Sequence, residues 1–219
     1  MLPRVLEPEV MDTAEEARDY DSMDHATVNR VFVADFLAAW DGGNPLLDVG
    51  TGTAQIPIEL CRQALTANVI AVDLAEEMLQ VGRENVRRAG LQDRLVLKCC
   101  DAKHLPFPDG AFAAVISNSI MHHIPDPSEV VAEVVRVTRP RGTVFIRDLL
   151  RPTNQEMLGR LENLYAGNAN AHQQKMFADS LRAALTLDEM RRLVSAIGFD
   201  PSAVLQTTDR HWTWTAIKK

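Results

Sequence analysis

The sequence has few cysteines, and they are not arranged as in a common structural site. Its 219 residues include three, Cys61, Cys99 and Cys100. None belongs to a C-x-x-C pair of the kind that binds structural zinc, so we predict no metal centre and no disulfide framework. We interpret all three as small buried apolar residues, with a redox or ligand-lining role for Cys99 or Cys100 as the alternative.

Excess positive charge and long apolar runs are also missing. Lys and Arg total 23 against 30 Asp and Glu, and the formal net charge of -7 gives no strong signal for binding a nucleic-acid backbone. No apolar stretch reaches about 18 residues, and residues 1–8 carry prolines and an acid where a secretory signal would be apolar. We therefore expect a cytoplasmic protein without a membrane span, and the sequence assigns no oligomeric state.

The sequence does contain an alternation of short apolar strands and amphipathic helices. A cap helix is predicted over residues 28–40, and later helices over 54–64, up to Gly90, and after Ser128. Strands are predicted at 46–49, 68–72, 95–99, 111–117 and 143–147. Because continuous apolar strands between helices are typical of a buried parallel sheet, we predict an α/β fold with a doubly wound sheet.

The alternation changes after the fifth predicted strand. Residues 149–185 form a polar, mostly helical insertion, and Thr186 and Glu189 form a capping box that opens a helix to residue 197. Two final strands, 203–207 and 212–217, are close enough for an antiparallel hairpin, with Trp212 and Trp214 facing the core. We predict cap or lid helices over residues 1–44 and a main domain over 45–219.

A glycine turn after the first strand is the most informative segment. In Gly50-Thr51-Gly52-Thr53-Ala54-Gln55, the glycines permit positive φ and close approach of a ligand to the backbone. Gln55 stands where a dinucleotide-binding G-x-G-x-x-G has its third glycine, which counts against NAD or FAD. Asp73 ends the second strand, where an acid can accept hydrogen bonds from both hydroxyls of a ribose.

Polar side chains also end the third and fourth strands. Asp101 could accept from the exocyclic amine of adenine, and Asn118 faces the region where the reactive end of a ligand would lie. The alternatives are local, because an Asp at a strand end can cap the next helix and an Asn can satisfy the backbone of a turn. Polar groups at four successive strand ends predict a single nucleoside-containing ligand at this edge.

Four ordered motifs give the chain a resemblance to a known family. They are Leu47-Asp48-Val49-Gly50-Thr51-Gly52-Thr53, the segment 72–79, the segment 101–109, and Ser117-Asn118-Ser119-Ile120-Met121-His122-His123-Ile124. With these motifs the chain resembles the class I S-adenosylmethionine-dependent methyltransferases, particularly small-molecule enzymes similar to those of ubiquinone and menaquinone biosynthesis. The resemblance implies a Rossmann-like seven-stranded sheet whose last strand is antiparallel, in agreement with the predicted hairpin.

The same resemblance implies S-adenosylmethionine as methyl donor and S-adenosylhomocysteine as product. Asp48, Gly50 and Gly52 would hold the methionine end of the donor, although an acid at position 48 could instead order the loop. Ala54 departs from the family's frequent third glycine. The other implied cofactor residues are Thr51, Asp73 for the ribose, Leu74, Met78, Asp101 and Ala102 for the adenine, and Ser117 and Asn118 near the sulfonium.

Candidate catalytic and acceptor residues lie in less regular segments. His122 and His123 follow the fourth strand, and either could contact the acceptor or act as a base, or else order the loop. Tyr20 and His25 could close over the cofactor as a lid, or belong to a solvated helix. Arg147 and Arg151 could clamp an anionic acceptor, or form a surface ion pair with Asp148. Tyr165 and His172 lie in the insertion and are further candidates for the acceptor side.

We therefore predict methyl transfer to oxygen, carbon or nitrogen of a small organic acceptor by in-line displacement. A general base is needed only where the acceptor carries a proton that must leave. The sequence lacks an Asn/Asp-Pro-Pro-Tyr/Phe stretch, which argues against methylation of a nucleobase or a glutamine amide. A non-catalytic S-adenosylmethionine-binding or regulatory subunit is the main alternative, and a nicotinamide-dependent oxidoreductase is a weaker one.

Overall fold

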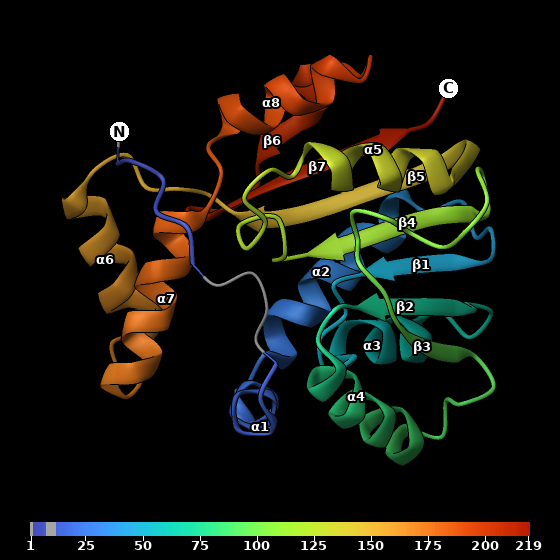
Figure 1. Cartoon of the computed structure of the whole chain (residues 1–219), viewed down its shortest axis with the longest axis horizontal. Coiled ribbons are helices and arrows are strands. Elements are labelled where there is room, and N and C mark those ends of the chain that lie inside the picture. The colour runs from blue at the N-terminus through green and yellow to red at the C-terminus, as the bar shows by residue number, and fades with distance from the viewer. Residues whose placement is uncertain (1, 8–11) are drawn as a thin grey trace. The chain divides into compact units, whose positions relative to one another are not determined.

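The computed structural model describes residues 2–7 and 12–219 and divides into two compact units (Figure 1). Within the described residues, the first unit holds 2–7, Ser119–Pro127 and Arg147–Trp214. The second holds 12–118, Ser128–Ile146 and Thr215–Lys219. The second unit contains the glycine turn and the strand ends that follow it along the chain, and the first contains the two adjacent histidines.

The strands form one seven-stranded sheet in the order β3-β2-β1-β4-β5-β7-β6 (Figure 1). This confirms the predicted Rossmann-like α/β class, and β6 pairs antiparallel with β7 as the predicted hairpin requires. The strands are β1 (Leu46–Val49), β2 (Val69–Asp73), β3 (Leu95–Cys99), β4 (Phe112–Asn118), β5 (Thr138–Leu149), β6 (Val204–Gln206) and β7 (His211–Ile217).

Parallel pairing aligns the carboxyl ends of the strands in the second unit. Val49 pairs in register with Val72 of β2 and with Ser117 of β4, and Asp73 pairs with Cys99 of β3. The last residue of each of these strands is therefore level, within a residue or two, with the last residue of the neighbouring strand. The turns that follow them share one edge of the sheet, which is where doubly wound folds bind ligands.

Helices complete the second unit. They are α1 (Ala14–Ser22), α2 (Ala26–Ala39), α3 (Gln55–Gln63), α4 (Glu76–Ala89) and α5 (Ser128–Val137). Thr13 and Glu16 form a capping box at the start of α1, which the sequence analysis did not identify. Phe32 and Phe36 of α2 pack edge-on against Phe145 of β5, with ring centroids 5.2 and 5.8 Å apart, so α2 is held by aromatic core contacts.

The first unit is built mainly from the helices of the insertion and the segment after it. These are α6 (Gln155–Ala166), α7 (Ala171–Ala183) and α8 (Leu187–Ala196), the last opened by the predicted Thr186–Glu189 capping box. Leu158, Leu161 and Leu181 are buried together where α6 and α7 pack. Trp212 and Trp214 are fully buried, as predicted, and Phe199 packs edge-on against Trp214. A helical insertion after the fifth strand is therefore confirmed.

Two predictions about local structure are wrong. β5 begins at Thr138 rather than at residue 143, because the Arg141 N–H donates to the Lys218 carbonyl and the Lys218 N–H donates to the Gly142 carbonyl. These bonds keep residues 141 and 142 within the strand instead of in a turn before it. Cys61 is buried as predicted, but Cys99 is exposed and Cys100 half-buried, and burial raises the pKa of Cys100 to about 11. Neither therefore supplies a reactive thiolate at neutral pH.

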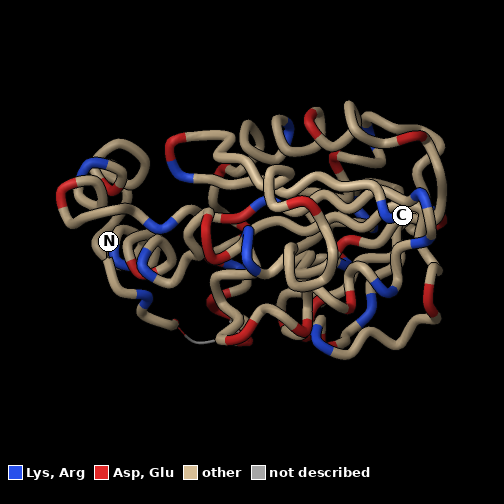
Figure 2. The backbone as a smooth tube through the Cα atoms, turned by 90° about the horizontal axis from the view of Figure 1, so that it is seen from above, with Lys and Arg blue, Asp and Glu red and all other residues tan. Residues whose placement is uncertain are grey.

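Charge is spread along the chain. Figure 2 shows Lys and Arg scattered among Asp and Glu rather than gathered in one segment. Among the described residues, no helix combines the length and apolar character needed to cross a bilayer.

Candidate functional site

The glycine turn between β1 and α3 adopts a strained backbone. Gly50, Gly52 and Ala54 have φ values of 76°, 54° and 64°. The Gly50 and Thr51 N–H groups both donate to the Val72 carbonyl, at 2.8 and 2.9 Å. Glycine at positions 50 and 52 is thus needed for the shape of the turn. The N–H groups of Gly50 and Thr51 bond to β2 and do not face a ligand. Ala54 tolerates at a cost a conformation that glycine would adopt freely.

Asp73 joins this turn to the end of β2. Its Oδ2 accepts from the Gly52 N–H at 2.7 Å, and its Oδ1 accepts from the Ala75 N–H at 2.9 Å. Burial raises the pKa of Asp73, and the backbone hydrogen bonds from Ala75 and Gly52 oppose that rise. Each carboxylate oxygen keeps a further lone pair, so the group can still accept hydrogen bonds from a ligand.

Asp48 lies beneath the same turn and is only 2% exposed. Burial raises its pKa to about 7, and the nearby charge of Asp73 adds to the rise. Its Oδ2 has no hydrogen-bond partner in the described part of the chain. A buried carboxylate oxygen without a donor is costly, and a cationic ligand group such as an ammonium would satisfy it. The residues at this turn therefore fit the amino-acid end of the donor that the sequence analysis predicts.

Tyr20 of α1 lies over the turn. A side chain added at Gly52 would place its Cβ 3.8 Å from Tyr20 Cε1, and Tyr20 packs against the cluster of Ala17, Ala75 and Met78. Burial raises the pKa of the Tyr20 hydroxyl, and the charges of Asp73, Asp21 and Asp48 add to it. The structure thus brings Tyr20 next to the candidate cofactor residues, where a lid would lie.

Gln55, which stands in place of the third glycine of a dinucleotide-binding motif, connects the turn to α1 and α2. Its Nε2 donates to Asp21 Oδ1 at 3.1 Å, and its Oε1 accepts from Asn29 Nδ2 at 3.3 Å. Asn85 of α4 donates to the same Asp21 carboxylate at 2.8 Å and to the Thr53 carbonyl at 3.1 Å. The sequence analysis missed this network, although polar amides on the inner faces of helices could have signalled it.

His25 borders this network without joining its hydrogen bonds. It caps α2 without a side-chain hydrogen bond, and its ring packs against Tyr20 in a tilted arrangement with centroids 5.0 Å apart. Burial lowers the pKa of His25, so the neutral imidazole is favoured. It also lines a cavity of about 500 Å³ together with Asp21, Asn29 and Gln55. His25 is thus part of the α1–α2 junction.

The candidate adenine residues differ in exposure. Met78 is 6% exposed, within the apolar cluster under α1, while Leu74 is 40% exposed. Asp101 Oδ1 accepts from the Lys103 N–H at 2.8 Å, and its other oxygen lies 3.5 Å from Lys103 Nζ. Asp101 thus orders the turn that contains half-buried Ala102, as the local alternative proposed, and retains lone pairs for a ligand.

Ser117 and Asn118 end β4 at the same edge. The Ser117 hydroxyl is buried and donates to the Val49 carbonyl at 2.8 Å, so its side chain ties β4 to β1. A contact of Ser117 with the donor would therefore be made through its backbone. Asn118 is half-buried at the last position of the strand.

His122, in the first unit, is held by two carboxylates. Its Nδ1 lies 2.5 Å from Asp148 Oδ1 and its Nε2 lies 3.5 Å from Glu7 Oε1. Burial opposes the charged imidazolium, yet the Asp148 carboxylate holds the pKa of His122 above its usual value. Asp148 is itself fixed by the N–H groups of Met121 and Leu149, at 2.5 and 2.6 Å.

His123 contacts the same glutamate. Its Nδ1 lies 3.2 Å from Glu7 Oε1, and its ring lies 4.2 Å from that of His122. The His123 side chain is 23% exposed, against 4% for His122. Sequence reasoning missed Glu7, because nothing in an N-terminal segment signals a contact with a loop far along the chain.

The two candidate arginines are buried. Arg147 Nε donates to the Thr213 hydroxyl at 2.9 Å, and Arg151 pairs with Glu189 at 2.6 Å. The predicted surface ion pair with Asp148 is wrong, because Asp148 is 1% exposed and pairs with His122. These side chains therefore carry internal contacts of the first unit.

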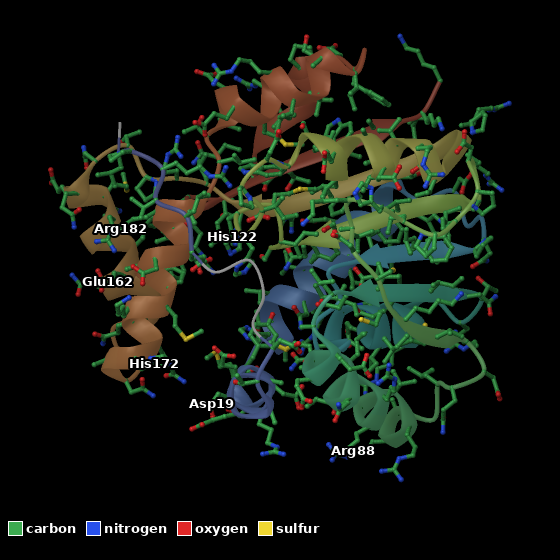
Figure 3. All side chains as sticks on the ribbon, viewed as in Figure 1. Asp19, Arg88, His122, Glu162, His172 and Arg182 are labelled. Carbon is green, nitrogen blue, oxygen red and sulfur yellow. The ribbon has the colours of Figure 1, made fainter. Side chains whose placement is uncertain are left out.

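Tyr165 and His172 lie on separate helices of the insertion. The Tyr165 hydroxyl donates to Asp209 at 2.9 Å, and the Arg210 guanidinium lies 3.3 Å from the centre of its ring. His172 is exposed near the start of α7, and Figure 3 shows it well away from His122. The two acceptor candidates of the insertion thus do not join the histidine pair.

Comparisons with known proteins agree with this geometry. Residues 47–146 match the family model described as a methyltransferase domain. The chain is 28% identical over 180 residues to 27-O-demethylrifamycin SV methyltransferase of Amycolatopsis mediterranei, covering 80% of this chain and 61% of that one. It is 26% identical over 174 residues to the ubiquinone/menaquinone biosynthesis C-methyltransferase of Geobacter sulfurreducens, covering 75% and 68%.

The fold is also shared with solved structures. An S-adenosylmethionine-dependent methyltransferase from Aquifex aeolicus superposes with a TM-score of 0.70 at 17% identity, covering 95% of this chain and 100% of that one. The chain spans about half the length of the first curated relatives it matches. Neither a nicotinamide-dependent oxidoreductase nor a non-catalytic subunit finds support in these relatives. Residues 47–146 thus match a methyltransferase domain, and the chain is similar to methyltransferases named for a rifamycin derivative and for quinone biosynthesis.

Proposed function

We propose that this chain transfers the methyl group of S-adenosylmethionine to a small organic acceptor in the cytoplasm. The observation that carries the proposal is the buried Asp48 carboxylate under the glycine turn, whose Oδ2 has no hydrogen-bond partner among the described residues. The relatives support the acceptor class, since one is named for a rifamycin derivative and another for quinone biosynthesis.

The proposed cofactor contacts follow from the chemistry of the side chains. Asp48 would accept a hydrogen bond from the ammonium of the donor, and the free lone pairs of Asp73 would bind the ribose hydroxyls. Leu74 and Met78 would pack on the adenine, and Asp101 and Ala102 would contact its edge. Tyr20 would exclude water from the methionine end, because its ring already lies over Gly52.

The main contribution of the protein to methyl transfer would be to position the acceptor relative to the donor. The donor supplies an already electrophilic methyl group on a sulfonium, so the protein must chiefly hold the acceptor in line with the breaking bond. Orientation of this kind can lower a barrier by roughly 7 to 11 kcal/mol. Where the acceptor carries a proton, we propose His123 as its contact or base, since its side chain is more exposed than that of His122.

Release of S-adenosylhomocysteine tests this function directly. The protein would be incubated with S-adenosylmethionine and separate pools of phenols, quinols, alcohols and amines, with the product quantified by mass spectrometry. We expect one acceptor class to give turnover that Asp48→Asn reduces strongly. If the donor binds with a defined affinity but no pool yields product, the non-catalytic alternative gains support. If the donor does not bind, the proposed function fails.

A further inference from the structure

Glu7, His122 and His123 bring three metal-ligating side chains together in the first unit. Among the described residues they are the one group of this kind, with ligand atoms within 4.8 Å of one another. A single oxygen, Glu7 Oε1, lies 3.5 Å from His122 Nε2 and 3.2 Å from His123 Nδ1. Two imidazole nitrogens and a carboxylate oxygen therefore lie together at one place in the first unit.

The electrostatics of this cluster favour a cation at that point. The Nδ1–H of His122 is suited to donate to Asp148 Oδ1 at 2.5 Å, which directs the lone pair on Nε2 towards Glu7. Positive charge between Nε2 and the Glu7 carboxylate, supplied by a proton on Nε2 or by a bound cation, stabilises this arrangement. A divalent cation would accept electron density from both groups at once.

The distances match those in a metal site. With Zn–N and Zn–O bonds of about 2.0 to 2.2 Å and tetrahedral angles, neighbouring ligand atoms lie about 3.3 to 3.5 Å apart. The two separations from Glu7 Oε1, 3.5 and 3.2 Å, are close to this spacing, and the ligand atoms of all three residues lie within 4.8 Å of one another. Little movement of the glutamate would be needed to bind an ion.

Hydrogen bonds from neighbouring groups also hold the proposed metal ligands in place, as they do in metalloproteins. A ligating histidine usually donates its other ring N–H to a carboxylate, and Asp148 is in that position for His122. The Ser180 hydroxyl donates to the Glu7 carboxylate at 3.1 Å. Arg4 fixes the N-terminal segment by donating to the carbonyls of Ile124 and Ala183 at 2.9 and 2.7 Å. Glu7 is thus held against the histidine loop by its own segment.

We propose that Glu7, His122 and His123 bind a divalent transition-metal ion of the zinc type. Three protein ligands leave a coordination position open to water or to an oxygen or nitrogen of a small molecule. The site shares His123 with the proposed methyl transfer, but zinc binding is measured without donor or acceptor, so failure of one proposal is distinguishable from failure of the other. A metal on His123 Nδ1 would occupy the nitrogen nearest Glu7, so metal binding excludes a base role for that nitrogen.

Zinc titration of the full-length protein tests the site. The protein would be stripped of metal with a chelator, and Zn²⁺ binding measured in competition with a chromophoric chelator. We expect one ion per chain, with affinity reduced in Glu7→Gln and His123→Ala by more than the roughly 10- to 100-fold that loss of an outer contact costs. His172→Ala and Glu156→Gln, which remove an exposed histidine and an exposed glutamate, should bind as the wild type does.

A second measurement separates loss of binding from loss of folding. Zn²⁺ should raise the melting temperature of the wild type and of both control variants, but not that of Glu7→Gln or His123→Ala, whose circular dichroism spectra should match the wild type. Absence of stoichiometric binding, or equal affinity in the wild type and Glu7→Gln, would overturn the proposal. Either result would show that Glu7 does not bind a metal ion in this cluster.

Discussion

Asp73 Oδ2 accepts a hydrogen bond from the Gly52 N–H at 2.7 Å, so the carboxylate proposed to bind the ribose also holds the glycine turn in shape. Substitution of Asp73 should therefore act on the cofactor directly and on the loop beneath it. Asp73→Ala should weaken S-adenosylmethionine binding by roughly 1.5 to 3 kcal/mol, the range for a hydrogen bond to a charged group. Calorimetric titration of both proteins measures the difference.

Asp73→Asn is the matched control for this change. It keeps a side-chain oxygen that can accept from one of the two backbone N–H groups. The melting temperature of Asp73→Asn should therefore lie closer to that of the wild type than the melting temperature of Asp73→Ala does. Its affinity for the donor should still fall, because the second acceptor is lost. If affinity is unchanged in Asp73→Ala, the ribose assignment is wrong.

The raised pKa of Asp48 predicts a pH dependence of stability. Its folded-state pKa is about 7, above the unfolded value of about 3.9, so the folded protein binds an extra proton between these limits. The contribution of Asp48 to the unfolding free energy is therefore most favourable at acid pH and is lost as the pH rises towards 7. At 1.36 kcal/mol per pKa unit the change is at most roughly 4 kcal/mol.

Asp48→Asn should remove that dependence. Denaturant unfolding at pH 5 and pH 8 should show the variant gaining stability relative to the wild type as the pH rises. A constant difference between the two proteins over this range would mean that Asp48 titrates normally.

Gly82 of α4 packs against the far side of the glycine turn. A Cβ there would lie 3.3 Å from the Thr53 carbonyl carbon and 3.4 Å from Ala54 Cβ, so Gly82→Ala should press on the loop. We expect a loss of about 1 to 3 kcal/mol in stability, as for other overpacked sites, and weaker donor binding. Ala54→Gly relieves both the contact and the positive φ of 64°. The double variant should thus recover part of the loss in a double-mutant cycle, and strictly additive effects would contradict this coupling.

His123→Ala should separate binding from turnover. His123 is not among the candidate cofactor residues, so the affinity for S-adenosylmethionine should stay close to that of the wild type. Turnover should fall by about 10²- to 10⁴-fold where the acceptor proton must leave. Calorimetry and single-turnover kinetics give the two quantities, and an equal loss of both would show a purely structural role.

The sequence predicts the strands of the sheet and the glycine turn well, because those features are local. Three of the four residues of Leu46–Val49 are apolar, and the run lies between a proline and a glycine, a pattern typical of a short buried strand. The hydrogen bond from Gly52 to Asp73 and the burial of Asp48 depend instead on parallel pairing, which brings together residues some 20 positions apart. No pattern within one segment reveals them.

The polar clusters were harder to predict for the same reason. His122 is conspicuous in the sequence, but its partners Glu7 and Asp148 come from other segments, and a lone glutamate or aspartate carries no signal of its own. Arg151 illustrates the opposite error. A charged residue after a strand suggests solvent or ligand contact, yet it is 6% exposed because Glu189 of α8 pairs with it.

Calorimetric titration of S-adenosylmethionine into the wild type and Asp48→Asn, in two buffers of different ionisation enthalpy at pH 7, tests the central claim most directly. Binding of a cation by ionised Asp48 should release about half a proton, because a group with a pKa near 7 is about half protonated there. We expect saturable 1:1 binding with proton release in the wild type, and weaker binding without proton release in Asp48→Asn. No saturable binding of the donor, or tighter binding of NADH, would contradict the account.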